Sequence, residues 1–269
     1  MGRHVLREGS PMTLRGSTEL VIFGHRAILE ALAHPAVEVL KLRRSHKSPP
    51  RFVKELDSAC RARAITPEVS TLEEVNAVSG APRHDQGVAA KIRLTNIIEP
   101  EVFAQSLTGR RAAEPTRLIA LDNVTNPQNI GMIVRSAVAS GMSGMLWPTV
   151  GSPWIDGLTI KSSASTIYSA TILRCGLLAD GLWTLKKFGF KVVGLAGEAS
   201  TLLRDHTPPH RAVYVVGSET EGITPSVAEA VDEFISIPMR NAVESLNVAV
   251  AAALVCFAAA PNNDPPRAS

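Results

Sequence analysis

The chain has 269 residues, of which 45% are hydrophobic, and this is enough for a substantial core in one large or two modest domains. Its longest apolar run, residues 248–260, is dominated by alanine and is shorter than the about 20 residues that a membrane-spanning helix needs. We therefore expect a soluble protein with no membrane span.

The charges are unevenly divided along the chain. The net charge is only +3, but residues 1–95 carry 15 Lys and Arg against 10 Asp and Glu, whereas residues 96–269 carry 13 against 15. A basic first part is typical of a region that meets a polyanion such as nucleic acid, and the second part then has another task. A solvated surface with a chance asymmetry is the alternative interpretation.

The first part of the chain reads as a tail followed by a small α/β domain. Residues 1–17 are polar and without periodicity, and we expect a flexible tail there; Met12 is a second candidate for the true start. Residues 18–96 predict a βαβαβ-like unit. Its expected elements are a strand from Leu20, a helix after Gly24, a strand at 37–44, a basic amphipathic helix over Phe52–Ala64, a short helix started by Ser70 or Thr71, and a strand at 87–94.

The second part alternates short apolar β-branched runs with helical patterns. Residues 97–116 contain Pro100, Gly109 and Pro115 and are interpreted as a linker with room for one short helix. Residues 117–260 predict a buried parallel sheet covered on both faces. The expected strands are Leu118–Val124, Gly144–Trp147, Lys191–Leu195, Ala212–Val216 and Phe234–Ile237. The expected helices are Asn129–Ser140, Ile160–Ser169, Asp180–Phe188, Pro225–Val231 and Ser245–Ala258. Residues 261–269 are expected to be disordered.

Three unusual loops each follow a predicted strand: NPQN, GSETEG and PMRNAVE. In open parallel sheets ligands bind beyond the carboxyl ends of the strands, so the three loops predict a ligand pocket at one edge of the sheet.

In the first loop, Asn129 stands where a helix is expected to start, able to cap it or to face a ligand, and Gly131 permits a close approach. Arg135 follows in the second turn, where its planar guanidinium suits a phosphate. A plain helix cap followed by a surface arginine is the alternative.

The second and third loops are also polar. Gly217 and Gly222 enclose two carboxylates, Glu219 and Glu221, which fit a ligand with a positive centre and hydroxyl or amine donors, as S-adenosylmethionine has; a solvated turn is the alternative. In the third loop Ser245 is the expected helix N-cap, and Asn247 lies in the first turn with its amide toward the ligand edge. A capping device without a ligand is the alternative there.

Other motifs that carry chemistry do not occur. The chain has no GxSxG elbow, GxxxxGK[ST] loop or GxGxxG fingerprint, which disfavours nucleotide hydrolysis and dinucleotide oxidoreduction. Its histidines show no HExxH-like spacing and its cysteines are far apart, so we predict no metal site. Because no secretory signal is evident, we interpret the cysteines as reduced, buried thiols of a cytoplasmic protein: Cys60, Cys175 and Cys256.

The three loops with their flanks resemble the motifs of a known family. In this order, LDNVTNPQNIGMIVRSA (121–137), VVGSETEGI (215–223) and ISIPMRNAVESLNVAVA (235–251) resemble the SpoU/TrmH family of RNA 2′-O-ribose methyltransferases in the SPOUT superfamily. FGHRAILEAL and HDQGVAAKI resemble the small L30e-like substrate-binding domain of members that act on large-subunit rRNA, and the chain is most similar to the 23S rRNA guanosine 2′-O-methyltransferase branch.

The resemblance implies a SPOUT fold with a deep trefoil knot in the C-terminal domain, a homodimer, and S-adenosylmethionine as the methyl donor with no metal. Family members bind this cofactor largely through backbone groups of the knot loops. The matching cofactor-binding positions are Leu195, Ala196, Gly197, Gly217, Ile237, Met239 and Leu246. The matching catalytic set is Asn129, Arg135, Glu219, Ser245 and Asn247.

The implied reaction transfers a methyl group to a ribose 2′-hydroxyl of RNA. Arg135 is suggested as the base in this family, yet a guanidinium with a pKa above about 12 is a poor base. We therefore expect Arg135 to hold the RNA phosphate and stabilise the developing alkoxide, while Asn129, Asn247 and Ser245 orient the ribose.

One segment departs from the family pattern. KSSASTIYSA (161–170) has Ser165 and Tyr168 where family members commonly have a small-residue stretch with Gly and a following Glu. The target nucleotide is therefore open. A tRNA methyltransferase, an inactive RNA-binding or assembly protein of the same fold, and a resistance-conferring rRNA methyltransferase are the alternatives to an enzyme acting on 23S-type rRNA.

Overall fold

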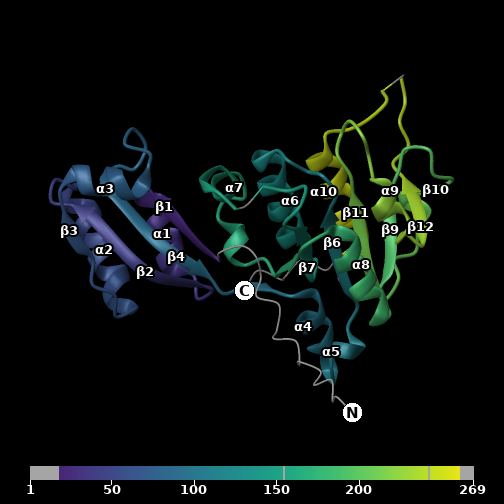
Figure 1. The fold of residues 1–269 in the computed structure, drawn as a ribbon, viewed down its shortest axis with the longest axis horizontal. Helices are drawn as coiled ribbons and strands as arrows, with labels where there is room; N and C mark the ends of the chain where they lie inside the picture. Colours follow the sequence, from purple (N-terminus) through teal and green to yellow (C-terminus); the bar gives the residue numbers. More distant parts are fainter. Residues whose placement is uncertain (1–17, 154, 242, 261–269) are drawn as a thin grey trace, which may run out of the picture.

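The structure is a computed structural model that describes residues 18–153, 155–241 and 243–260. The tails predicted at 1–17 and 261–269 lie outside these residues. The chain forms two units that lie at opposite ends of the long axis of the molecule, with the N-terminal unit on the left in Figure 1.

The N-terminal unit is a small sheet with helices packed on it. Its elements are β1 Glu19–Phe23, α1 His25–Ala33, β2 Val37–Ser45, α2 Pro50–Ala62, β3 Glu68–Ser70, α3 Leu72–Ser79 and β4 Val88–Leu94. The sheet order is β1-β4-β2-β3, with β4 antiparallel to both of its neighbours. The helical spacing predicted after Gly24 is confirmed, because Ile28, Ala31 and Leu32 are buried on one face of α1.

The predicted start of the third helix is also confirmed. Thr71 caps α3 with a capping box, in which Thr71 Oγ1 accepts from Glu74 N at 3.2 Å and Thr71 N donates to Glu74 Oε2 at 2.9 Å.

The second unit is built on a larger sheet. Its elements are β5 Ile97–Ile98, α4 Pro100–Gln105, α5 Arg110–Ala113, β6 Thr116–Leu121, α6 Pro127–Ser140, β7 Gly144–Pro148, α7 Gly157–Ser162, the 3-10 turn η1 Thr166–Tyr168, β8 Ile172–Cys175, α8 Leu178–Lys187, β9 Lys191–Leu195, β10 Thr201–Leu202, the 3-10 turn η2 Leu203–Asp205, β11 Arg211–Val216, α9 Pro225–Ala228, β12 Glu233–Ser236 and α10 Val248–Ala259. In the described residues the strand order is β10-β12-β9-β11-β6-β7-β8-β5, and every pairing is parallel.

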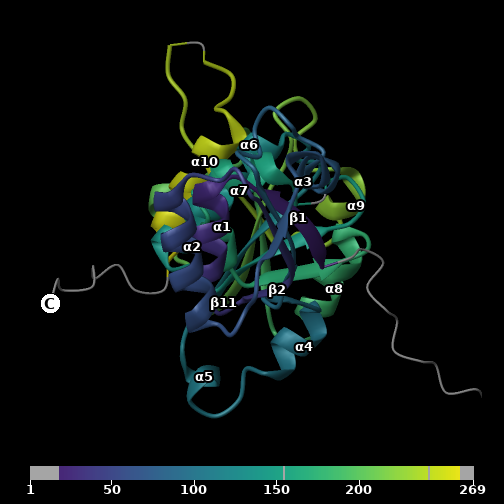
Figure 2. The same ribbon diagram turned by 90° about the vertical axis from the view of Figure 1, so that its left-hand side faces the viewer.

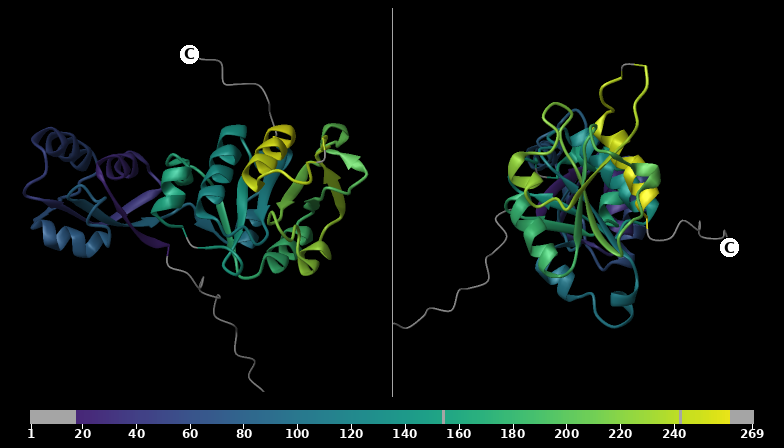
Figure 3. Two further views of the ribbon diagram at one scale, coloured as in Figure 1. Left: turned by 90° about the horizontal axis from the view of Figure 1, so that it is seen from above. Right: turned by 90° about the vertical axis from the view of Figure 1, so that its right-hand side faces the viewer.

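Helices cover both faces of this sheet, as Figure 3 shows. On one face α4, α8 and α9 bury Phe103, Leu182 and Val227 against strand residues such as Val213 and Val215. On the other face α6 and α10 pack on each other and on the remaining strand residues, which are continuous with the core of the N-terminal unit. The predicted α/β class with a buried parallel sheet is confirmed.

Several predicted boundaries were wrong. The helix expected over Ile160–Ser169 is broken into α7 and η1, because Ala164 and Ser165 adopt positive φ angles of 48° and 62°. The strand β8 was not predicted. The segment expected as a linker places β5 at the sheet edge beside β8 and packs α4 on α8, so it is part of the second unit.

The two units are joined by hydrogen bonds as well as by the chain. Asn96 Nδ2 donates to the carbonyl oxygens of Ile167, Tyr168 and Ala170 at 2.8, 3.3 and 2.6 Å. Ser169 Oγ lies 2.9 Å from His34 Nε2. The region between α7 and β8 therefore provides the acceptors and the hydroxyl group for the hydrogen bonds with His34 and Asn96.

Candidate functional site

Loops that are far apart in the chain meet at the carboxyl edge of the larger sheet. β9, β11, β6 and β12 lie within one run of neighbouring parallel strands, so the residues after each of them leave the sheet at the same edge. The described residues between β12 and α10, yellow in Figures 1 and 2, extend from this edge away from the body of the molecule.

The carboxylate of Glu219 is the centre of the hydrogen-bonded cluster at this edge. Its Oε1 accepts from Asn129 Nδ2 at 3.2 Å, from Asn247 Nδ2 at 2.7 Å and from the backbone N–H of Val248 at 3.1 Å. Asn247 Nδ2 also donates to Asn129 Oδ1 at 3.2 Å. The cluster thus ties together the three loops that the sequence singled out, and it includes three of the five predicted catalytic residues.

The loop that carries Glu219 is a tight turn after β11. Ser218 and Gly222 form an antiparallel bridge, and Ser218 Oγ accepts from Glu221 N at 3.1 Å. A Cβ at Gly217 would lie 2.1 Å from the carbonyl carbon and oxygen of Gly222, so only glycine fits there. Glu221 is exposed, and its side chain makes no hydrogen bond or ion pair among the described residues.

A buried aspartate that the sequence reasoning missed supports this loop from β6. Asp122 is 4% exposed, and its Oδ2 accepts from the backbone N–H of Thr224 at 2.6 Å. Its position directly after the apolar strand LIAL is the signal that could have identified it, because a carboxylate at a strand end faces the loops at that edge.

Helix α6 places Asn129 and Arg135 differently from the prediction. The N-cap is Asn126, whose Oδ1 accepts from Gln128 N at 2.9 Å, and Pro127 takes the first helical position. Asn129 therefore lies inside the first turn, 6% exposed, rather than at the cap. Arg135 is exposed, roughly 9 Å further along the helix axis, and has no ion-pair or hydrogen-bond partner among the described residues.

The start of α10 also differs from the prediction. Asn247, not Ser245, is the N-cap, because Asn247 Oδ1 accepts from Ala249 N at 3.0 Å. Ser245 is exposed in the loop before the helix and makes no hydrogen bond within the described part of the chain. The structure therefore does not bring Ser245 into the Glu219 cluster.

The predicted cofactor-binding residues follow β9, β11 and β12 or precede α10. Ala196 N donates to Ile235 O at 3.0 Å, which fixes the end of β9 to β12. Among the described residues, the backbone groups of Gly217, Ile237 and Leu246 make no hydrogen bond. The remaining predicted residues line the same edge: Leu195, Gly197 and Met239.

This edge offers amides, carboxylates and free backbone groups rather than a side-chain nucleophile. The three cysteines are free, and Cys175 is half-buried rather than buried. Burial raises the pKa of both the Cys175 and the Cys256 thiol to about 12, so neither is a thiolate at neutral pH. Within the described residues no group of His, Cys, Asp and Glu is arranged to hold a metal ion. Among all the residues that the structure describes, no helix is long and apolar enough to cross a membrane.

Solved structures resemble this fold over most of its length. The SpoU methyltransferase AviRb from Streptomyces viridochromogenes, in complex with AdoMet, matches with a TM-score of 0.72 and 22% identity over 90% of this chain and 89% of that chain. The AdoMet-bound rRNA methyltransferase from Sinorhizobium meliloti matches with a TM-score of 0.70 and 21% identity over 90% and 87%. This likeness shows the fold; the trefoil knot and the L30e-like character of the N-terminal unit stay predictions.

Curated relatives are more similar in sequence. An uncharacterized tRNA/rRNA methyltransferase of Mycolicibacterium paratuberculosis is 33% identical over 198 residues, which are 72% of this chain and 63% of that protein. The chain therefore spans less than two thirds of that relative. A TrmH family tRNA/rRNA methyltransferase of Staphylococcus saprophyticus is 30% identical over 241 residues, which are 89% of this chain and 94% of that protein.

Family models match both units of the chain. Residues 21–96 match the model described as RNA 2′-O ribose methyltransferase substrate binding, and residues 116–257 match the SpoU rRNA Methylase family. The second match includes the Glu219 cluster and every predicted catalytic residue. The chain therefore belongs to the SpoU rRNA methylase family.

Proposed function

We propose that this protein transfers a methyl group from S-adenosylmethionine to a ribose 2′-hydroxyl of RNA, and that the RNA is 23S-type rRNA. The observation that carries the proposal is the Glu219 cluster, which joins three separate family motifs into one constellation at the carboxyl edge of the sheet. The choice of rRNA is supported by the N-terminal match to an RNA substrate-binding domain and by the resemblance of this unit to domains of rRNA-modifying members.

The edge fits S-adenosylmethionine in its chemistry. A sulfonium and an amino group are attracted to carboxylates, and Glu219 and Glu221 supply two of them beside this edge. The unpaired backbone groups of Gly217, Ile237 and Leu246 are donors and acceptors for the polar parts of such a ligand. When it is bound, the cofactor supplies an electrophilic methyl group that needs no metal.

We infer separate roles for the two asparagines from their hydrogen bonds. An amide nitrogen has two donor hydrogens, and Asn247 Nδ2 uses both of them, on Glu219 and on Asn129. We therefore assign Asn247 to positioning the loop before α10 rather than to contacting the ribose. Asn129 donates only once in the cluster, so one hydrogen of its amide can reach a ribose oxygen.

Arg135 carries the electrostatic part of the proposed mechanism. It is exposed on α6, and its guanidinium has no partner among the described residues, so it can bind a phosphate of the RNA backbone. In the same position it stabilises negative charge that develops on the 2′-oxygen. Holding the hydroxyl in line with the methyl group supplies the rest by proximity.

A pair of measurements tests the function. We would titrate the protein with S-adenosylmethionine by calorimetry and then follow radiolabelled methyl transfer to bulk rRNA and bulk tRNA. Binding with transfer to rRNA supports the proposal, and transfer to tRNA alone replaces its substrate. No cofactor binding would favour the inactive RNA-binding alternative. Arg135→Ala should abolish transfer and keep cofactor binding, with Arg135→Lys as the charge-preserving control.

We also propose a homodimer that forms through α10. Val250, Leu254 and Phe257 lie on one side of this helix and are 49%, 44% and 53% exposed, although the rest of the helix is packed on α6. Such an apolar stripe at helical spacing is typical of a surface that another chain covers. Sedimentation of the wild type and of Leu254→Glu tests the dimer, because a charge introduced in the apolar stripe should prevent association and leave a monomer.

We also propose that the enzyme is located in the cytoplasm, where its RNA substrates are made.

A further inference from the structure

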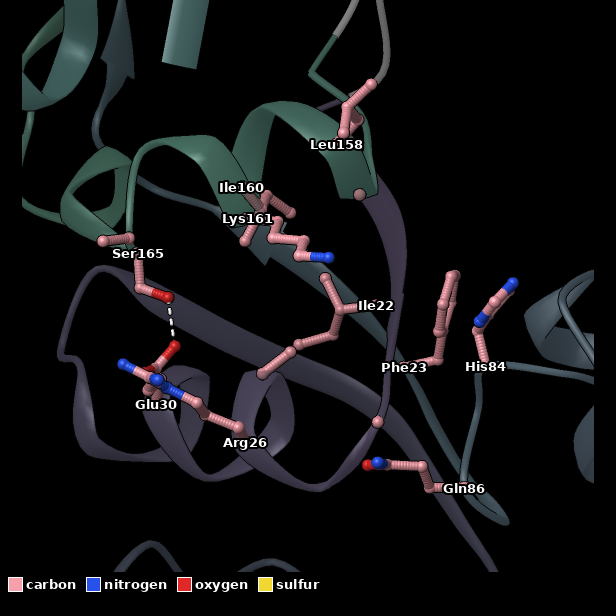
Figure 4. Close-up of a pocket in the computed structure, with 14 residues that line it drawn as sticks. Ile22, Phe23, Arg26, Glu30, His84, Gln86, Leu158, Ile160, Lys161 and Ser165 are labelled. Atoms are coloured by element: carbon pink, nitrogen blue, oxygen red, sulfur yellow. Dashed lines mark hydrogen bonds and ion pairs between the residues drawn. The ribbon is translucent and has the colours of Figure 1, made fainter. Parts of the chain in front are cut away.

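A cleft lies between the two units. It has a volume of about 830 Å³ and is lined by the end of β1, by α1, by the turn at residues 84–86 and by α7. We call it the interdomain cleft; Figure 4 shows its lining residues. A volume of this size falls in the range of ligand-binding pockets.

The cleft combines an apolar floor with polar ends. Ile22, Ile160 and Leu158 supply apolar surface. Phe23 and His84 both line the cleft, and Lys161 extends from α7 into the space above Ile22 in the view of Figure 4. An aromatic ring, an apolar floor and a cation within one cleft match the base and the phosphate of a nucleotide.

Both sides of the cleft are held in place by hydrogen bonds. On the α1 side, Gln86 Oε1 accepts from His25 N at 2.8 Å, which replaces the missing side-chain cap of α1. On the α7 side, Ser165 Oγ donates to Glu30 of α1, and this bond spans the two units. The positive φ of Ser165 turns the chain so that its side chain can reach Glu30. The cleft is therefore a built feature of the junction.

The charges favour an anion at the end formed by Lys161. Glu30 is the one carboxylate among the described lining residues, and it is already occupied by Ser165 Oγ and by Arg26 Nε at 2.6 Å. Lys161 is exposed and has no ion-pair partner in the described part of the chain. Its ammonium group is therefore available to a phosphate.

We propose that the interdomain cleft binds one unstacked nucleotide of the RNA, with its base on Phe23 and its phosphate on Lys161. This inference rests on the proposed function, because it takes RNA as the ligand. A nucleotide held here contacts both units at once, so it sets the position of the RNA relative to the carboxyl edge. Three residues of the segment 161–170, which departs from the family pattern, line the cleft and would thereby influence which RNA is accepted: Lys161, Ala164 and Ser165.

The test separates the base contact from the phosphate contact. The full chain is titrated with short fluorescein-labelled oligoribonucleotides of A, C or U at several salt concentrations, and binding is followed by anisotropy. Phe23→Leu keeps an apolar side chain but removes the ring, and we expect binding to weaken roughly tenfold with an unchanged salt dependence. Lys161→Gln should make the negative slope of log K against log salt shallower by about 0.7, the value for one lost phosphate contact on a single strand.

Two controls make the result specific. Lys187→Gln removes an exposed lysine on α8, far from the cleft, and should leave both affinity and slope unchanged. Lys161→Arg keeps the charge and should restore the slope. Unchanged binding in both Phe23→Leu and Lys161→Gln would overturn the proposal. Cofactor titration and methyl transfer by the same proteins test the proposed function separately. A protein that fails to transfer methyl groups but shows the expected changes in oligoribonucleotide binding would refute the proposed function and leave the cleft assignment standing.

Discussion

Asn247 and Glu219 are 28 positions apart in the chain, yet Asn247 Nδ2 lies 2.7 Å from Glu219 Oε1. The same carboxylate oxygen accepts the backbone N–H of Val248 in the first turn of α10. A negative charge at a helix N-terminus is favourable because the first N–H groups have no partner within the helix. Glu219 therefore stabilises the start of α10 as well as the loop that precedes it.

Removing this carboxylate should weaken both the fold and the site. We expect Glu219→Ala to lower the free energy of unfolding by about 1–3 kcal/mol, because the buried amide of Asn129 loses its acceptor. Cofactor affinity should fall as well, because the loops at the carboxyl edge lose their common anchor. Glu219→Gln is the matched variant, since its Oε1 accepts the same three donors without the charge, and it should lie between Ala and wild type. Equal free energies of unfolding for the wild type, Glu219→Ala and Glu219→Gln would contradict this assignment.

Glycine at position 217 should be indispensable for the turn after β11. A Cβ there would lie 2.1 Å from Gly222, so Gly217→Ala should destabilise the protein by about 1–3 kcal/mol and reduce cofactor affinity. Gly176→Ala is the control, because a Cβ at Gly176 meets nothing within 4 Å. Thermal unfolding and calorimetric titration of both variants check this. A Gly217→Ala protein that behaves like the control would show that the turn can relax.

Stability should fall as the pH drops into the acid range because of His206. Its side chain is 3% exposed, and burial lowers the pKa of His206 below its ordinary value of 6.5, although Glu233 partly opposes this. Below about pH 6.5 the unfolded chain then binds a proton that the folded protein does not, so the free energy of unfolding decreases. We expect the unfolding temperature to decrease between pH 7.5 and 5 in the wild type and to decrease less in His206→Gln. His210→Gln, an exposed histidine, should follow the wild type.

The junction between the units should depend on Asn96. Its amide nitrogen donates to three carbonyl oxygens of residues 167–170, so Asn96→Ala should cost about 1–3 kcal/mol in the free energy of unfolding. Asn96→Asp should cost more, because a carboxylate cannot donate and repels the carbonyl oxygens. Chemical denaturation measures both, with Gln105→Ala on the surface of α4 as the control. Equal stability of Asn96→Asp and the control would show that water replaces the amide.

Local patterns predicted the second unit well where strands are apolar throughout. β9 and β11 were predicted almost to the residue, because Val-rich runs between Gly, Pro and charged residues have few other interpretations. β8 was missed because its sequence, ILRC, is short and contains Arg174, a residue type that is rarely buried. The strand formed by Ile97 and Ile98 could not be predicted either, because two residues are too few to show the alternation that identifies a strand.

Site boundaries depended on contacts that no local pattern contains. Ser245 and Asn247 are both favoured helix caps, and the contact of Asn247 with Glu219 accompanies the choice of the later one. The break at Ala164 and Ser165 has no Gly or Pro to announce it, and it coincides with the bond of Ser165 to Glu30 in the other unit. The catalytic and cofactor-binding roles stay predictions from the family resemblance.

The Glu219 cluster has a consequence for the order in which the protein matures. A chain grows from its N-terminus and its domains fold as units during synthesis, so the N-terminal unit is complete once β4 has been made. The cluster needs Asn129, Glu219, Asn247 and Val248, and the last two lie near the end of the chain. We therefore expect a ribosome-bound nascent chain to have a folded N-terminal unit while the carboxyl edge of its larger sheet is still unassembled, so that the Glu219 cluster is among the last parts of the protein to form.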